Sequence, residues 1–241
     1  MPSAFDIIAE DFTEDLNDLK DLVKSSDSPG GNPRVRIAAA NSTTLLLAAT
    51  FEEFIREMAR AYAREVVNNT ESFEKLPSKM ASTAWKRTMD GLSRIRFDAT
   101  QPANGHENPF GAAMSRFSVL HDFCRGDLSQ DIYRDLIHNE NNMRPNEINS
   151  LFKLSGLSDV CKKASEKTRI LDFFGEADSN KAHGKLLLSL EDFFERRNSI
   201  AHALNSRQSN GPGQILNDIE LLESFGLALS QTLAEVSPNT V

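Results

Sequence analysis

The sequence has few cysteines, little tyrosine or tryptophan, and no long apolar run. Cys124 and Cys161 are its two cysteines, and one pair this far apart gives neither a zinc spacing nor a disulfide framework. The longest apolar cluster, residues 45–49, is too short to span a bilayer. The first residues show no basic segment followed by an apolar one, as a secretion signal would. We therefore expect free thiols in a cytoplasmic protein without a membrane partner.

Several catalytic motifs are also missing. The Gly30-Gly31 turn lacks the Lys-Ser/Thr ending of a phosphate-binding loop, and no Gly-x-Ser-x-Gly elbow is present. Four histidines lie outside any spacing typical of zinc ligands: His106, His121, His138 and His183. The sequence therefore indicates no cofactor and no metal.

Apolar residues recur at three- and four-residue steps along most of the chain, which predicts helices. Clusters of proline and glycine, as in residues 28–33 and 101–105, mark breaks between them. The pattern shows no alternation typical of strands and predicts an all-α fold, with residues 98–177 the most irregular part. The predicted helices cover about 1–27, 36–68, 78–96, 109–124, 129–137, 145–154, 158–166, 178–204 and 214–235.

Charge is distributed unevenly along these helices. Residues 1–27 hold eight acidic and two basic residues, which is −6 of the chain's net −8. The overall charge is therefore a poor guide to the partner. The helix predicted after Pro77 is basic, with only Asp90 opposing five cations, and is the best candidate for a contact with an RNA backbone. We expect Trp85 on its inner side and select four residues as RNA-binding: Lys79, Lys86, Arg87 and Arg94.

The long helix before the C-terminal one carries an unusual cluster. Its apolar stripe passes through Leu190 and then meets Arg197, where an apolar residue would be expected. Asn198 and His202 are four residues apart and so share the next face of the helix. Imidazole can move a proton near neutral pH, and a guanidinium can bind phosphate oxygens. These groups suit cleavage of RNA by its own 2′-hydroxyl, with a 2′,3′-cyclic phosphate as the first product.

The same residues also have a structural interpretation. Arg and His near the end of a helix interact favourably with its dipole, and a short spacing of this kind often arises by chance. In that case Arg197 and His202 only stabilise the helix end.

The segment Arg197-Asn198-Ser199-Ile200-Ala201-His202 resembles the Arg-Asn-x-x-x-His signature of the HEPN superfamily. Residues 45–55 resemble the first core helix of the RiboL-PSP-HEPN branch and its MAE-type relatives, with Phe51-Glu52-Glu53-Phe54 matching a Phe-Glu-x-aromatic element. Together the two matches cover roughly residues 37–68 and 180–236.

This resemblance implies a single HEPN-like helical domain over residues 1–241. Residues 37–68 and 180–236 would form the core helices, residues 78–177 would be inserted helices and loops, and residues 1–27 an accessory acidic helix. The sequence offers no family role for the acidic helix, which could limit the access of RNA to the site.

The resemblance also implies a function. Active members of the family cleave RNA without metal, usually as homodimers with the motif at the interface, and often as toxins or anti-phage effectors held by a neutralising or activating protein. By carry-over, Arg197 and His202 are catalytic and Asn198 assists. Glu52 holds Arg197 or is a solvated carboxylate. The alternative function is a HEPN module that binds RNA, a nucleotide or a protein without cleavage.

Overall fold

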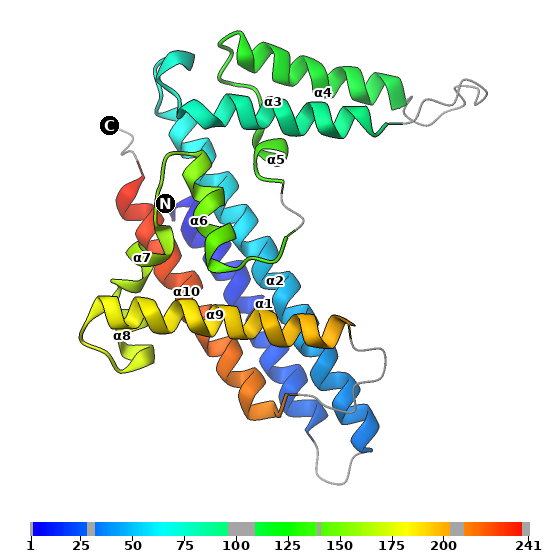
Figure 1. Ribbon diagram of the computed structural model, residues 1–241, viewed down its shortest axis with the longest axis vertical. Helices are drawn as coiled ribbons and strands as arrows, with labels where there is room; N and C mark the ends of the chain where they lie inside the picture. The colour runs from blue at the N-terminus through cyan, green and yellow to red at the C-terminus, as the bar shows by residue number, and fades with distance from the viewer. Residues whose placement is uncertain (1, 28–31, 96–108, 139–140, 203–209, 238–241) are drawn as a thin grey trace, which may run out of the picture. The chain divides into compact units, whose positions relative to one another are not determined.

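The computed structural model describes residues 2–27, 32–95, 109–138, 141–202 and 210–237 (Figure 1). Every regular element among these residues is a helix, as predicted. The chain packs as two compact units. The first comprises Met1–Met58, Asn141–Ser150 and Leu157–Val236, and the second is formed mainly by Ala59–Glu140. That the chain is one domain stays a prediction.

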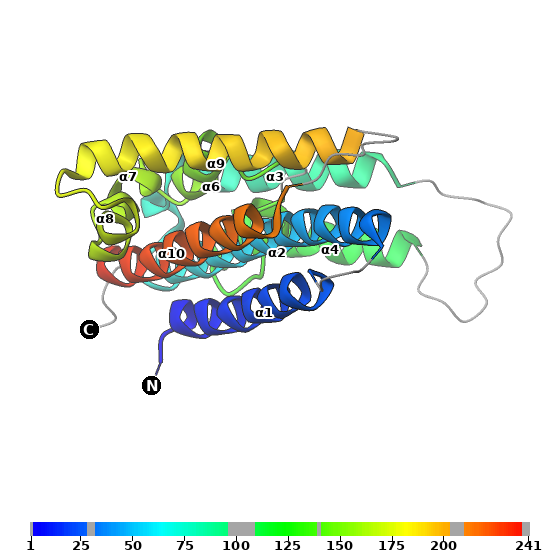
Figure 2. The ribbon, with the colours of Figure 1, turned by 90° about the horizontal axis from the view of Figure 1, so that it is seen from below.

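The first unit contains the long helices. They are α1 (Ala4–Ser26), the beginning of α2 (Pro33–Asn68), α9 (Ser179–His202) and α10 (Pro212–Val236), with the short α7 (Val160–Ser165) and α8 (Thr168–Phe174). Seen from below, α9 lies on one side, α10 and the beginning of α2 in the middle, and α1 on the other side (Figure 2).

Phenylalanines hold these layers together. Phe51 of α2 is fully buried, and its ring lies 6.3 Å from Phe12 of α1, 6.2 Å from Phe194 of α9 and 6.1 Å from Phe225 of α10. Phe12 also stacks on Phe54 at 4.1 Å. Beside them α10 carries Gly226, where a Cβ would come within 2.8 Å of the Phe12 ring, so only glycine allows this approach.

The acidic helix α1 is part of this core. Ser3 and Asp6 form a capping box at its start, with hydrogen bonds of 3.1 and 2.9 Å. Its apolar side packs against α10, and its acidic residues lie on the outer side. Deleting the helix would therefore expose the core, and its effect on RNA access has to be tested by changing surface charges instead. Six of its side chains are buried: Phe5, Ala9, Phe12, Leu16, Leu19 and Val23.

The second unit contains the rest of α2, a short 3-10 helix (Phe73–Lys75), α3 (Ser78–Ser93), α4 (Pro109–Cys124), α5 (Tyr133–Leu136) and the end of α6 (Pro145–Leu154). Helix α3 packs against both α4 and α5. Phe73 meets Phe123 edge-on at 5.7 Å, and Tyr62 lies 6.1 Å from Phe152.

In the middle of the chain the bounds of two predicted helices are wrong, and one helix was not predicted. The helix expected over 129–137 is only the four-residue α5, because Asp127 accepts hydrogen bonds from Ser129 and Gln130 and holds that stretch in a turn. Helix α7 begins at Val160 and not at residue 158, because Asp159 has a left-handed conformation with φ 54°. Helix α8 was not predicted, since a seven-residue helix ended by Gly175 carries too little periodicity to detect.

The predicted ends of two further segments lie outside the described residues. One is the stretch after α3, which includes Arg96, the predicted loop at 101–105 and His106. The expected extension of α9 to residue 204 is the other, because the described helix ends at His202.

Candidate functional site

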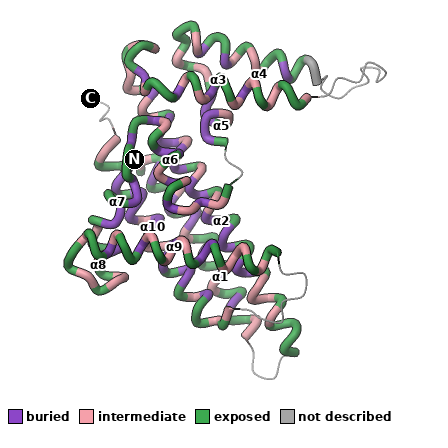
Figure 3. Tube along the Cα trace, in the orientation of Figure 1, coloured by how far each residue is buried: buried purple, intermediate pink, exposed green. Residues whose placement is uncertain are grey.

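The motif lies where α9 leaves the hydrophobic core. The buried stripe of this helix runs through Ala182, Leu186 and Leu190 to Phe193 and Phe194, and ends there. Beyond it no residue of the described helix is buried, and residues 195–202 are intermediate or exposed (Figure 3). The motif residues therefore lie on the last turns of α9, beyond the end of its buried stripe.

Arg197 and Asn198 are half-buried, and His202 is exposed. Arg197 Nη1 donates a 3.2 Å hydrogen bond to Asn198 Oδ1. His202 follows Asn198 by four residues, so both lie on one side of α9. The arrangement places a cation, a fixed amide and an accessible imidazole at one helix end.

Glu52 of α2 is the anionic neighbour of Arg197. Burial raises the pKa of the Glu52 carboxyl, and the positive charges of Arg197 and Arg56 oppose this rise. Glu52 Oε1 and Arg197 Nε are both buried without a hydrogen bond. The two groups thus interact through their charges and not through a direct hydrogen bond. Each keeps one buried polar atom that a bound group could still satisfy.

Asn142 is a residue that the sequence did not single out. Its side-chain amide donates a 2.8 Å hydrogen bond to Asn198 Oδ1, which therefore accepts from both Asn142 and Arg197. This double contact fixes the orientation of the Asn198 amide and leaves its Nδ2 as the donor for another group. The polar run around residue 142 was the only sequence signal, and we predicted no more than a loop there.

Arg144 holds the same segment against α9. It donates to Glu191 at 2.5 Å and to Glu195 at 2.6 Å, one helical turn apart. Hydrogen bonds to both carboxylates raise the pKa of Arg144. The segment before α6 is thereby joined to α9 at Arg144 as well as at Asn142.

A second ion pair joins the motif helix to α10. Arg196 lies 2.7 Å from Asp218, whose residue is only 2% exposed, and Gln214 donates to the same oxygen at 2.9 Å. Burial raises the pKa of Asp218, while Arg196, Gln214 and their hydrogen bonds lower it. This contact sets the position of the residue next to Arg197.

Three of the predicted RNA-binding residues lie on α3 in the second unit, and the fourth, Arg94, caps its C-terminal end. Lys79, Lys86 and Arg94 are exposed. Arg87 is half-buried, and its guanidinium donates to the main-chain carbonyl of Leu136. Arg87 thus links α3 to α5, whereas the other three remain available to a ligand. The placement of Trp85 on the inner side of α3 was wrong, because its side chain is 44% exposed.

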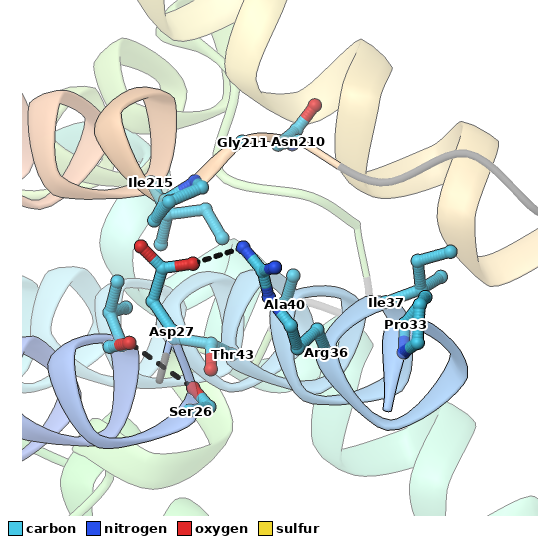
Figure 4. Close-up of a pocket in the computed structure, with 12 residues that line it drawn as sticks. Ser26, Asp27, Pro33, Arg36, Ile37, Ala40, Thr43, Asn210, Gly211 and Ile215 are labelled. Carbon is cyan, nitrogen blue, oxygen red and sulfur yellow. Dashed lines mark hydrogen bonds and ion pairs between the residues drawn. The ribbon is translucent and has the colours of Figure 1, made fainter. Parts of the chain in front are cut away.

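A pocket of about 300 Å³ lies in the first unit among α1, α2 and α10. In Figure 4 Arg36 points towards Asp27, with which it forms an ion pair. Ile37 and Ile215 contribute apolar walls. None of the predicted site residues lines this pocket.

The described part of the chain offers no group of three or more His, Cys, Asp or Glu side chains that could hold a metal ion. Within the same residues, no helix is both long enough and apolar enough to cross a membrane. We therefore assign no metal ligand.

In a comparison with protein-family models, the RiboL-PSP-HEPN model matches residues 10–235. No curated protein and no solved structure matches the chain. The family match covers most of α1, the helices between α2 and α9, and nearly all of α10, which extends well beyond the two segments that carry the resemblance in the sequence.

Proposed function

Because the chain belongs to the RiboL-PSP-HEPN family, we propose that it is a metal-independent endoribonuclease with Arg197 and His202 as its catalytic residues. The HEPN family generally includes ribonucleases, so a function in RNA chemistry is expected for its members. The geometry at the end of α9 supports the proposal that this chain cleaves RNA. There Arg197 is half-buried beside Glu52 and Asn198, whereas His202 is exposed.

In this proposal the RNA supplies its own nucleophile. His202 takes the proton of a ribose 2′-hydroxyl, and the 2′-oxygen forms a bond to the adjacent phosphorus. The bond from phosphorus to the 5′-oxygen breaks, and that oxygen leaves with a proton from an acid. Arg197 stabilises the charge on the non-bridging oxygens, and Asn198 Nδ2 donates to the phosphate or the sugar. The products are a 2′,3′-cyclic phosphate and a 5′-hydroxyl.

One imidazole cannot easily be base and acid in the same turnover, so we propose that a homodimer supplies two motifs. The helix that carries Glu52 supports this proposal with an exposed apolar stripe. Its members lie at helical spacings that lead towards Glu52 on α2: Val35, Ala38, Leu45, Leu46 and Ala49. Val35 is 62% and Leu46 50% exposed, which is unusual for large apolar side chains unless a partner covers them.

The decisive experiment compares three proteins with one RNA. Wild type, Arg197→Ala and His202→Ala are incubated with a 5′-labelled 30-nucleotide RNA in EDTA, and the product ends are identified. We expect cleavage that leaves cyclic phosphate by the wild type alone. Arg169→Ala, an exposed arginine of α8, is the matched control and keeps full activity. Equal cleavage by all four proteins would show contamination and contradict the proposal.

The biological role that we propose is that of a toxin or phage-defence effector, with a neutralising or activating protein as its partner. Induced expression in bacteria tests this role: wild type is expected to stop growth, and His202→Ala to leave it unaffected. Binding of RNA by wild type without any cleavage in EDTA would instead favour the non-cleaving HEPN module.

A further inference from the structure

Helices α3 and α4 carry an aromatic cluster on an outer face. Trp85 of α3 meets Phe117 of α4 edge-on at 6.4 Å, and Phe117 stacks on His121 one turn further along α4 at 6.0 Å. Met114 lies one turn before Phe117 on the same side of α4. We call these four residues the α3–α4 aromatic face.

Two large apolar side chains of the aromatic face are exposed, and Phe117 between them is half-buried. Trp85 is 44% and Met114 45% exposed, and among the described residues of the second unit they are its two large exposed apolar side chains. His121 is exposed as well. The core side of α3 is occupied by Met80, Ala84 and Thr88, so the packing of the helix does not need the tryptophan. A large ring at the surface without a role in the core indicates an interaction site.

Cations flank the aromatic face. Lys86 follows Trp85 directly, and Lys79 lies on the same side as Lys86 because seven residues are close to two helical turns. Both lysines are exposed, and neither forms an ion pair with any residue that the structure describes. The acids nearby are Asp90 on α3 and Asp122, which lies 3.0 Å from the His121 ring. The lysine edge next to Trp85 therefore holds two cations and one acid, Asp90, one turn after Lys86.

We propose that the α3–α4 aromatic face binds single-stranded RNA, with bases stacked on Trp85 and on the Phe117–His121 pair and phosphates bound by Lys79 and Lys86. Exposed rings beside unpaired cations are the combination by which proteins hold unpaired bases, because every base has a flat π face. A base-paired helix keeps its bases stacked on one another and cannot use the rings. A wholly apolar protein partner would leave the two lysines without counter-charges.

This inference rests on the proposed function for its choice of RNA, but it predicts a site on helices that carry none of the motif. Its test therefore measures binding and needs no cleavage. Trp85 is the only tryptophan of the chain, so its fluorescence reports on this face alone. Titrations use the His202→Ala variant, to avoid cleavage, and a labelled 12-nucleotide oligouridine or the same length of RNA duplex.

We expect oligouridine to quench the fluorescence of Trp85 in step with the rise in anisotropy of the labelled RNA. Trp85→Leu should weaken binding on the order of ten- to a hundredfold, and Trp85→Phe should restore much of it. Lys86→Ala and Lys79→Ala should each lower the slope of log affinity against log salt by about one. Leu188→Ala, another exposed apolar residue but on α9, is the matched control and should bind like the parent.

Four outcomes would overturn the proposal. They are an absence of RNA binding at low salt, unchanged Trp85 emission at saturating RNA, equal affinity of Trp85→Leu, and a preference for duplex. Self-association that depends on Trp85 and not on RNA would assign the face to a second copy of the chain instead. Failure of the proposed function has a different signature, because RNA would still bind here while Arg197 and His202 had no effect on cleavage.

Discussion

The side-chain amide of Asn142 donates a 2.8 Å hydrogen bond to Oδ1 of Asn198, the second residue of the motif. The donor comes from the segment before α6, far from α9 in the sequence. A residue outside the motif helix thus orients the motif amide, and Asn142 is a positioning residue in our proposal.

Replacing Asn142 by alanine is expected to lower the cleavage rate about three- to tenfold, the equivalent of one hydrogen bond of about 1 kcal/mol. Steady-state kinetics check this prediction, and we expect kcat to fall by a larger factor than KM rises. Asn146→Ala changes an exposed asparagine near the start of α6 and should leave the rate unchanged. Equal rates for both variants would remove Asn142 from the site.

Changing Glu52 to glutamine tests the interaction with Arg197. The folded-state pKa of Glu52 is raised, mainly by burial, so the folded protein holds the Glu52 proton more tightly than the unfolded chain does. Its contribution to stability is therefore complete below the ordinary value of 4.5 and is lost as pH rises through the raised pKa.

We therefore expect the free energy of unfolding of wild type, relative to Glu52→Gln, to increase as pH is lowered from neutral towards 4.5. Urea denaturation at several pH values measures this difference. Glu53→Gln, an exposed neighbour paired with Arg56, provides the control and should show no such rise. If this difference decreased on acidification, the charge of Arg197, and not burial, would dominate the pKa of Glu52.

Removing Arg196 leaves Asp218 without its cationic partner in the core. We expect Arg196→Ala to lower the free energy of unfolding by about 3 kcal/mol at neutral pH, because a buried charge then lacks compensation. Burial already raises the pKa of Asp218, so part of this loss should be regained in mild acid, where the carboxyl binds a proton. Thermal or urea unfolding measures these free energies. Asp218→Asn should destabilise the protein less than Arg196→Ala does, because it leaves no buried charge.

Leu46 tests the proposed dimer. Leu46→Glu places a charge on the exposed α2 stripe and should raise the dimer dissociation constant on the order of a hundredfold, with cleavage lost in parallel. Ile7→Glu on α1 changes a residue of almost equal exposure, 49% against 50%, and should leave the dimer intact. Sedimentation and cleavage are measured over the same concentrations. A monomeric wild type with full activity would contradict the two-motif proposal.

Local sequence patterns were sufficient for most of the fold. The bounds of α4 and α6 agree with the prediction, and α1, α2, α9 and α10 differ at their ends by a few residues. These helices show clear apolar periodicity, and proline or glycine marks their ends. The short α5 and α8 were misjudged because side-chain hydrogen bonds and single turns decide such segments. Trp85 was misplaced because helical spacing alone does not tell which of two apolar sides faces the core.

The sequence by itself identified the helix that carries Arg197, Asn198 and His202, since all three lie within one helical turn and a half and their relation follows from helical geometry. The rest of the site depends on residues that are distant along the chain. Asn142 on Asn198, Arg144 on two glutamates of α9 and Asp218 beside Arg196 are brought together by packing, and such long-range contacts leave no periodic signal in a single sequence. Only the folded core, where Phe51 brings α1, α2, α9 and α10 into contact, places these partners around the motif.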